Sequence, residues 1–453
     1  MARRNHRGRA FRDHEANRGG YGFALSADRS FREGLRILSI SFCGSVSDHF
    51  SGTFICTSEY LSFMEILFVE PQYYSKYPPL GLLKLASYHR SRGDKISLVR
   101  GPEQNLNIDP DMVYITSLFT FAWAPVHKAI EYYQKKFPSA KISVGGLYAS
   151  IMPDRVKSHY PLVDVHVGLH ESAEQYMPAY DILDTVEKWK NWDSSILFST
   201  RGCIRNCPFC VVPKLEGKIR VAIPEVQNFI HPNHKQVILW DNNFLASPLW
   251  KKTIVDLKET GLKIDFNQGL DARLMDEEKA QHIADLNMPT IRMAYDFKDE
   301  KAAVERAVEH LEEAGIRRRK ILFYTLFNFY NPDSGYGDTP ESFLEIIQDI
   351  ADLGCVSYPM RYEPITSLKK NQFISPLWAP GQLEAIADAR RVIGFGGAFP
   401  PYQGLVDKFL SAKTFDEAFE LRPKQSKDNV SKSMNEGLEQ DACTRGESTV
   451  SSC

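Results

Sequence analysis

Three cysteines lie within ten residues of this chain, in "RGCIRNCPFC" at 201–210. Cys203, Cys207 and Cys210 follow the spacing C-x3-C-x2-C, and the next cysteine lies far along the chain. Structural zinc usually takes four ligands in two close pairs, which a compact triplet does not provide. Three thiolates can instead hold a [4Fe-4S] cluster whose fourth iron is open to a small molecule. The spacing therefore predicts an iron-sulfur site rather than a zinc site.

The cysteines directly follow a predicted strand, which is the first of a series. Strands are expected at "ILFST", "QVILWD", "KIDFNQ", "TIRMAYD", "KILFYTLF" and "CVSYPMRYEP", and helical patterns separate them. Six such β/α units make three quarters of an eight-fold (β/α) barrel, in which chemistry gathers at the carboxyl ends of the strands. We therefore expect a partial (β/α)6 barrel of the TIM type over residues 194–365.

Polar side chains follow three later strands of this series, at the barrel end where the cysteines are expected. Each of these side chains could contact a ligand, but each alone is equally well explained as a cap of its loop. The candidates are Asp241, Asn242 and Asn243 after the second strand, Gln268 and Asp271 after the third, and Asp296 after the fourth.

Residues 64–180 alternate strand and helix and predict a doubly wound parallel sheet of the Rossmann type. Ligands of such sheets bind beyond the carboxyl ends of the strands. Ser117 in "YITSLFT" and the pair Gly145 and Gly146 in "SVGGLYAS" occupy such ends. Paired glycines let a ligand approach the backbone, but they also form tight turns, so both interpretations stay open.

Composition limits the remaining possibilities. The chain has 453 residues, is 43% hydrophobic and 25% charged, and has a net charge of -2. These values suit two or three ordinary globular domains and indicate neither a nucleic-acid nor a membrane partner. No apolar run reaches the roughly 18 to 20 residues that span a bilayer. Unevenly spaced cysteines without a signal peptide predict a cytoplasmic protein with reduced thiols.

Outside the two α/β domains, the pattern of apolar residues changes. We predict a disordered or spurious amino-terminal extension (1–63), a linker (181–193), a helical cap (366–423) and a disordered tail (424–453).

The segment "STRGCIRNCPFC", with Phe209 just before the third cysteine, resembles the cluster loop of the radical S-adenosylmethionine (radical SAM) superfamily. The resemblance covers about residues 194–365. It implies a [4Fe-4S] cluster on the three cysteines, with the amino and carboxylate groups of SAM on the fourth iron. An electron from a donor such as flavodoxin or ferredoxin then cleaves SAM to a 5′-deoxyadenosyl radical. In this family a Gly-Gly-Glu that often follows the second strand contacts the amino group of SAM, and "WDNNF" stands in its place here. The resemblance therefore implies SAM contacts at 241–243. Further candidates for SAM binding are Phe209, Gln268, Asp271 and Asp296.

The upstream segments "YPPLGLLKLASYHRSRG", "TSLFT", "VGGLYAS" and "VHVGLHE" resemble the amino-terminal domain of cobalamin-dependent radical SAM proteins. This resemblance implies a cobalamin whose nucleotide tail runs beside Gly145 and Gly146, with Ser117 as a hydrogen-bond donor. The D-x-H-x-x-G motif that supplies a cobalt ligand in other cobalamin domains is absent, because "DVHVG" is one residue short. We therefore expect His166 to be a core or edge histidine.

The leading hypothesis is a cobalamin-dependent methyltransferase that acts on an unreactive carbon or phosphorus centre. A tRNA or protein methylthiotransferase is an alternative, because "CPFCVVPKLEGKIR" is also close to that family's loop, although only Cys43 and Cys56 precede it where three cysteines are needed for a second cluster. A radical SAM enzyme of ring closure or rearrangement and a non-enzymatic iron-sulfur module are the remaining alternatives. The residues do not identify a substrate.

Overall fold

The computed structural model describes residues 63–393, 398–399 and 402–421. The predicted tail, the predicted extension up to residue 62, and Cys43 and Cys56 lie outside these residues. Both predicted α/β domains belong to one compact unit. Within the described ranges, no helix combines the length and apolar character needed to cross a membrane.

The first half of this unit contains the predicted parallel sheet. All neighbouring strands pair in parallel, in the order β2-β1-β3-β4-β5. Because the central strands are covered on both faces, their sequences are nearly continuous apolar runs. The strands are β1 (Glu65–Glu70), β2 (Lys95–Arg100), β3 (Met112–Ser117), β4 (Lys141–Gly146) and β5 (Asp164–Val165).

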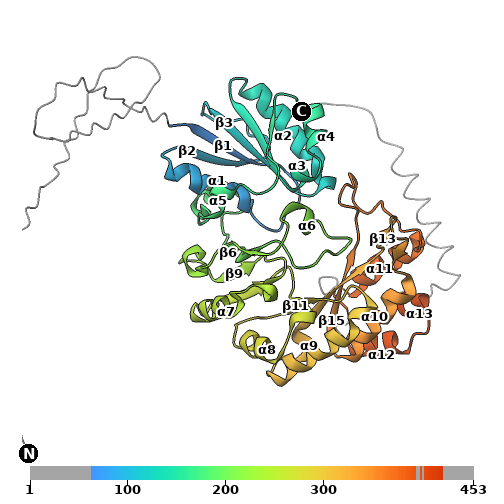
Figure 1. Cartoon of the computed structure of the whole chain (residues 1–453). Helices are drawn as coiled ribbons and strands as arrows, with labels where there is room; N and C mark the ends of the chain where they lie inside the picture. The colour runs from blue at the N-terminus through green and yellow to red at the C-terminus, as the bar shows by residue number, and fades with distance from the viewer. Residues whose placement is uncertain (1–62, 394–397, 400–401, 422–453) are drawn as a thin grey trace, which may run out of the picture. The chain divides into compact units, whose positions relative to one another are not determined.

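Helices cover both faces of this sheet, as Figure 1 shows. Side chains alternate along a strand, so Phe68 of β1 packs with Leu83 of α1 while Val69 packs with Ile130 of α2. One face carries α1 (Leu80–Ser91) and α5 (Glu171–Glu174), and the other carries α2 (Trp123–Lys136), α3 (Leu147–Ile151) and α4 (Pro153–His159).

The second half contains the six predicted strands in sequence order, with helices between them. They form two parallel sheets, β6-β9-β10 and β11-β12-β15, which the isolated bridge Leu270↔Met293 joins within the described part. The expected partial barrel is therefore interrupted between β10 and β11, because the chain turns out of the ladder at Gly269, whose φ is +89°. The strands are β6 (Ser194–Leu197), β9 (Gln236–Leu239), β10 (Lys263–Phe266), β11 (Ile291–Ala294), β12 (Ile321–Phe327) and β15 (Val356–Arg361). We call this half the six-strand domain.

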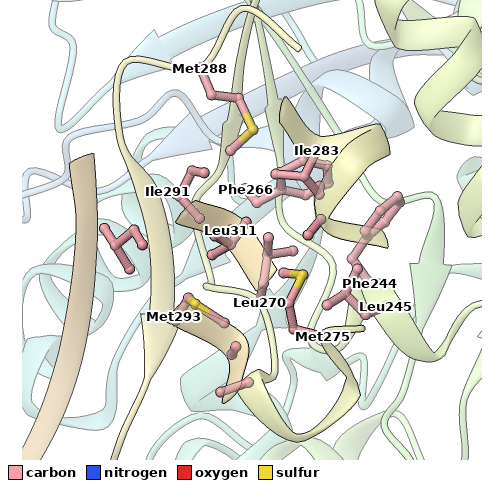
Figure 2. Close-up of a cluster of buried hydrophobic side chains, with 14 of the residues drawn as sticks. Phe244, Leu245, Phe266, Leu270, Met275, Ile283, Met288, Ile291, Met293 and Leu311 are labelled. Atoms are coloured by element: carbon pink, nitrogen blue, oxygen red, sulfur yellow. The ribbon is translucent and has the colours of Figure 1, made fainter. Parts of the chain in front are cut away.

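A hydrophobic core joins these strands to the helices that follow them. Figure 2 shows part of it, where Phe266 and Met293 from two strands lie among side chains such as Ile283 and Leu311 from two helices. These helices are α7 (Trp250–Glu259), α8 (Glu277–Ala284), α9 (Lys301–Glu313) and α10 (Pro340–Asp352). Phenylalanines then pack α10 against α11 (Pro380–Ile393), α12 (Gln403–Ser411) and α13 (Phe415–Phe419).

The segment between β1 and α1 packs directly on the six-strand domain. Leu80 is buried with Ile196 and Ile238. The ring of Tyr77 lies edge-on to Trp240 with centroids 5.2 Å apart, and its hydroxyl accepts a hydrogen bond of 2.8 Å from Asn267 Nδ2. The two halves thus share a small apolar core.

The segment predicted as a linker also packs against the sheet. Ile182, Leu183, Val186 and Trp189 are buried with residues of β1 and α1. Trp189 Nε1 donates a hydrogen bond of 2.6 Å to the buried carboxylate of Glu70. This connecting segment therefore packs as part of the folded core.

A buried histidine at the start of the six-strand domain makes the unfolding free energy of the protein depend on pH. His234 lies edge-on to Tyr180, with its Nδ1 2.8 Å from Ser195 Oγ, and burial together with His231 lowers its pKa to about 4. The unfolded histidine, with a pKa of about 6.5, binds a proton that the folded one excludes, so stability rises with pH from about 4 to about 6.5. We expect His234→Asn to flatten this dependence of the unfolding free energy, measured by urea denaturation across that range. An unchanged slope in the variant would contradict this assignment.

Candidate functional site

A small antiparallel ladder closes the base of the cysteine loop. Strand β7 (Thr200–Arg201) pairs with β8 (Arg220–Val221), and the short helix α6 (Val212–Leu215) lies between them in sequence. Cys203 N donates to Gly217 O at 3.2 Å. Gly202 has a φ of +76°, and a Cβ there would lie 2.3 Å from Lys218 O, so only glycine fits before the first cysteine.

Cys203, Cys207 and Cys210 are all free, partly exposed thiols on this loop. Cys203 Sγ accepts hydrogen bonds from Arg205 N at 3.3 Å and from Asn243 Nδ2 at 3.7 Å, as a thiolate ligand would. Burial raises the pKa of the Cys207 thiol to about 11, and the charge of the neighbouring Cys210 is the next largest cause. Cys207 and Cys210 therefore need positive charge nearby to be thiolates together.

In the described residues, no three His, Cys, Asp or Glu side chains converge as ligands of a single metal ion. Each thiolate of an iron-sulfur cluster binds its own iron, so its sulfurs stand farther apart than the ligands of one ion. The donor set and its spacing in sequence therefore fit a cluster.

Asp241, one of the predicted SAM contacts, has a carboxylate that is already engaged within the protein. Its buried carboxylate accepts four hydrogen bonds, from Ser199 N at 3.0 Å, Ser199 Oγ at 2.5 Å, Thr200 N at 2.7 Å and Thr200 Oγ1 at 2.7 Å. Burial raises the pKa of Asp241 in spite of these bonds. Asp241 therefore holds the backbone that leads into the cysteine loop.

Asp271 organises the polar groups beside Cys203. Its carboxylate accepts from Arg205 Nε at 3.0 Å, from Arg273 Nε at 2.7 Å and from Asn243 Nδ2 at 3.1 Å. The Oδ1 atom of Asn243 is buried without a partner among the described residues. It is the atom here that a bound amino group would satisfy, and it lies at the position where the resemblance expects the SAM amino contact.

Asp296 lies farther along the same polar network. Arg273 Nη1 bonds Glu300 Oε1 at 2.5 Å, and Glu300 Oε2 accepts from Asp296 N at 3.1 Å. Asp296 Oδ1 accepts from Leu326 N at 3.2 Å. Burial and the charge of Glu300 raise the pKa of Asp296 to about 7. A SAM contact by Asp296 remains a prediction, with part of its carboxylate already engaged.

Three other candidates have distinct surroundings. Phe209 packs on Phe297 and Phe329, with ring centroids 5.8 and 5.9 Å away, so it anchors the cysteine loop to the ends of two strands. Asn242 Nδ2 donates to Glu216 Oε2 at 2.9 Å. Gln268 is exposed and contributes no described contact to the cluster of polar groups.

A pocket of about 260 Å³ lies between α1 and the sheet, where it runs along β3 and reaches the carboxyl ends of β4 and β5. Its wall includes Gly81 and Lys84 of α1, Gly145, and Arg201 from the base of the cysteine loop. Such a volume is below the roughly 300 to 1,000 Å³ of typical small-molecule sites, so it suits one part of a large cofactor.

Two histidines in the wall of this pocket have free hydrogen-bonding atoms. His166 Nε2 and His170 Nδ1 are buried and have no partner among the described residues. His166 directly follows the edge strand β5 and lies in the pocket wall. Both nitrogen atoms are positions that a ligand would satisfy.

Ser117 and Gly146 belong to the turn that supports the pocket. Ser117 Oγ donates to Gly145 O at 2.7 Å and accepts from Ala149 N at 3.0 Å, so its hydrogen is already used. Gly146 has a φ of +93°, and a Cβ there would lie 2.3 Å from Ser117 O. Gly146 therefore needs to be glycine for this turn, whereas a Cβ on Gly145 would meet only ordinary contacts.

No protein-family model matches the chain. Two curated proteins named tRNA-2-methylthio-N(6)-dimethylallyladenosine synthase are similar to part of it. The one from Flavobacterium psychrophilum is 26% identical over 203 residues, covering 37% of this chain and 42% of that protein. The one from Corynebacterium urealyticum is 30% identical over 136 residues, covering 24% of each. The chain thus spans less than half the length of these curated relatives.

Among solved structures, the fold is similar to that of the radical S-adenosylmethionine methyltransferase TsrM from Kitasatospora setae, solved with its tryptophan substrate and the SAM analogue aza-SAM. The TM-score is 0.50 at 13% identity, and the match covers 66% of this chain and 75% of that one. The chain is thus similar in fold to a radical SAM methyltransferase and similar in part of its sequence to two methylthio synthases.

At the cysteine loop, the sequence analysis missed three arginines. Arg201, Arg205 and Arg273 each bond a carboxylate near the cysteine loop. Two of them flank Cys203 in "TRGCIR", and a charge placed two residues from a predicted thiolate ligand was the signal available. Their partners, Glu174 and Asp271, lie on other elements and carry no local signal.

Proposed function

We propose that this chain is an enzyme that reductively cleaves SAM at a [4Fe-4S] cluster held by Cys203, Cys207 and Cys210. The cluster supplies the electron, and the cleavage yields a 5′-deoxyadenosyl radical. The observation that carries the proposal is the cysteine loop itself, since donors from Arg205 and Asn243 reach Cys203 and leave Asn243 Oδ1 free for a ligand. The aromatic contacts of Phe209 hold the third-cysteine end of the loop in place.

We further propose that the sheet domain binds cobalamin and that the reaction is a methyl transfer to an unreactive centre. The glycine-lined pocket would take the nucleotide part of the cofactor, and His166 Nε2 and His170 Nδ1 would bond its polar atoms. Arg201 lies in the pocket wall and two residues before Cys203, so the two cofactors would lie at adjoining sites. Binding at such a site serves to orient the reactants and exclude water.

A methylthiotransferase is the second candidate, because the two curated relatives carry that name. Enzymes of that class would need a second cluster. The printed sequence has two cysteines before the loop, and Cys355 is buried in the core of the six-strand domain. A chain of this class would contain about eight irons, whereas the leading proposal requires about four.

The test is reconstitution of the whole chain with iron and sulfide without oxygen, followed by dithionite and SAM. We expect about four irons per chain and formation of 5′-deoxyadenosine and methionine. After incubation with hydroxocobalamin and gel filtration, we expect about one cobalt per chain. A full cluster without SAM cleavage would overturn the first proposal, and a full cluster without cobalt would overturn the second.

Gly81 offers a direct test of the pocket. It lies on α1 in the pocket wall, and a Cβ there would meet nothing within 4 Å, so the fold accepts a side chain. Gly81→Phe should fill the pocket and lower bound cobalt at least tenfold while iron stays at about four per chain. Gly381→Phe, on α11 with equal space, is the matched control and should keep its cobalt. Equal cobalt in both variants would exclude this pocket as the cobalamin site.

A further inference from the structure

A chain of buried ion pairs begins in the pocket wall and ends at the cysteine loop. Lys84 Nζ donates to Glu174 Oε2 at 3.1 Å, and Arg201 donates to the same oxygen from Nε at 3.0 Å and from Nη2 at 2.7 Å. Arg201 Nη1 also donates to Glu216 Oε1 at 3.2 Å. Lys84, Glu174 and Arg201 all line the pocket, so a ligand bound there would touch this chain of pairs.

The far end of these pairs holds the backbone next to the first cysteine. Glu216 Oε2 accepts from Gly202 N at 2.9 Å and from Asn242 Nδ2 at 2.9 Å. Gly202 immediately precedes Cys203 in the chain, and Asn242 precedes Asn243, which bonds Cys203 Sγ. A shift of Glu216 would therefore move both groups that position Cys203.

Arg201 is the link between the two ends. Its side chain is 7% exposed, and its guanidinium carbon lies 3.4 Å from the ring centroid of Phe198. The planar fork of an arginine can bond two carboxylates at once, which a lysine cannot do in the same geometry. Two cations and two carboxylates balance each other here, and removing one would leave an unpaired charge in a buried place.

We propose that Arg201 is a positioning residue that transmits occupancy of the pocket to Cys203 through the Lys84–Glu174–Arg201–Glu216 pairs. A ligand with a hydrogen-bond acceptor competes with Glu174 for the side chains of Lys84 and Arg201. When Arg201 bonds the ligand instead of Glu174, its hydrogen bond to Glu216 changes as well. The inference rests on the proposed SAM chemistry at the cysteine loop. It adds to that chemistry a residue that acts through Glu174 and Glu216.

The first experiment needs no pocket ligand. The variant Glu174→Gln keeps the shape of the side chain and removes its charge. In the reconstituted whole chain, we expect iron to stay at about four per chain and the dissociation constant of SAM to rise about fivefold or more. The constant is measured from the electron paramagnetic resonance signal of the reduced cluster during SAM titration.

The matched control is Glu171→Gln on the same short helix, whose exposed side chain pairs with Arg220. It should bind SAM as the wild type does. Arg201→Lys, which keeps the charge and loses the fork, should weaken SAM binding as Glu174→Gln does, and it replaces that variant if Glu174→Gln fails to fold. Wild-type SAM affinity in the folded variants would overturn the proposal.

The second experiment adds hydroxocobalamin as the pocket ligand. We expect it to change the SAM dissociation constant of the wild type by about fivefold or more, and SAM to change cobalamin affinity by the same factor. In Glu174→Gln this factor should fall towards one. Binding of both ligands without any coupling in the wild type would overturn transmission from the pocket. If no cobalt binds, the cobalamin assignment fails, and the first experiment alone decides the role of Arg201.

Discussion

Replacing Cys203, Cys207 and Cys210 together by alanine will lower iron in the reconstituted protein from about four per chain to nearly zero. The three thiols lie on one loop, and Cys203 already receives donors from Arg205 N and Asn243 Nδ2. Without the thiolates, the loop offers the cluster no ligand. Iron and sulfide analysis and the electron paramagnetic resonance spectrum after reduction measure the loss. SAM cleavage should disappear with the cluster.

Cys355→Ala is the control for this variant. Cys355 is also a free cysteine, but it is buried in the hydrophobic core of the six-strand domain. Its loss should cost some stability and leave about four irons in place. A full cluster in the triple variant would contradict the assignment of the three cysteines.

Asp241→Ala will lower the free energy of unfolding by about 3 kcal/mol or more. The substitution leaves two backbone N–H groups and two hydroxyls, from Ser199 and Thr200, without their buried acceptor. Because these residues lead into β7 and the cysteine loop, cluster assembly should also fall. Urea denaturation of the unreconstituted protein measures the first effect separately from the second.

The matched control is Asp256→Ala. Asp256 pairs with a partly exposed lysine, Lys252, on the surface of α7, and such a pair contributes about 0 to 1 kcal/mol. If Asp241→Ala lost no more stability than this control, the carboxylate would not be holding the backbone before the cysteine loop.

The sequence predicted the elements well because the apolar pattern determines them locally. "EILFVE" and "KISVGG" became β1 and β4, and the parallel order of the first sheet followed from alternating strands and helices. The break between β10 and β11 was not predictable in this way. It depends on how the turn at Gly269 meets the next strand rather than on the apolar period of either strand.

The hydrogen-bond partners of the candidate site residues could not be predicted from the sequence either. Asp241 stands where the family likeness expects a SAM contact, but Ser199 and Thr200 reach its carboxylate from the neighbouring strand. Ser117 follows a strand as predicted, yet its hydroxyl bonds Gly145 O. Strand ends show which residues gather at one edge of a sheet, and only the three-dimensional packing shows which of them remain free for a ligand.

The packing of Tyr77 and Leu80 on the six-strand domain has a consequence for synthesis on the ribosome. Leu80 contacts Ile196 and Ile238, and Tyr77 contacts Trp240; the last of these partners follows about 160 residues later in the chain. Synthesis adds about 5 to 20 residues per second, so roughly 8 to 32 s pass between the synthesis of Tyr77 and that of Trp240. The nascent sheet domain therefore emerges with Tyr77 and Leu80 uncovered until the six-strand domain has been synthesised.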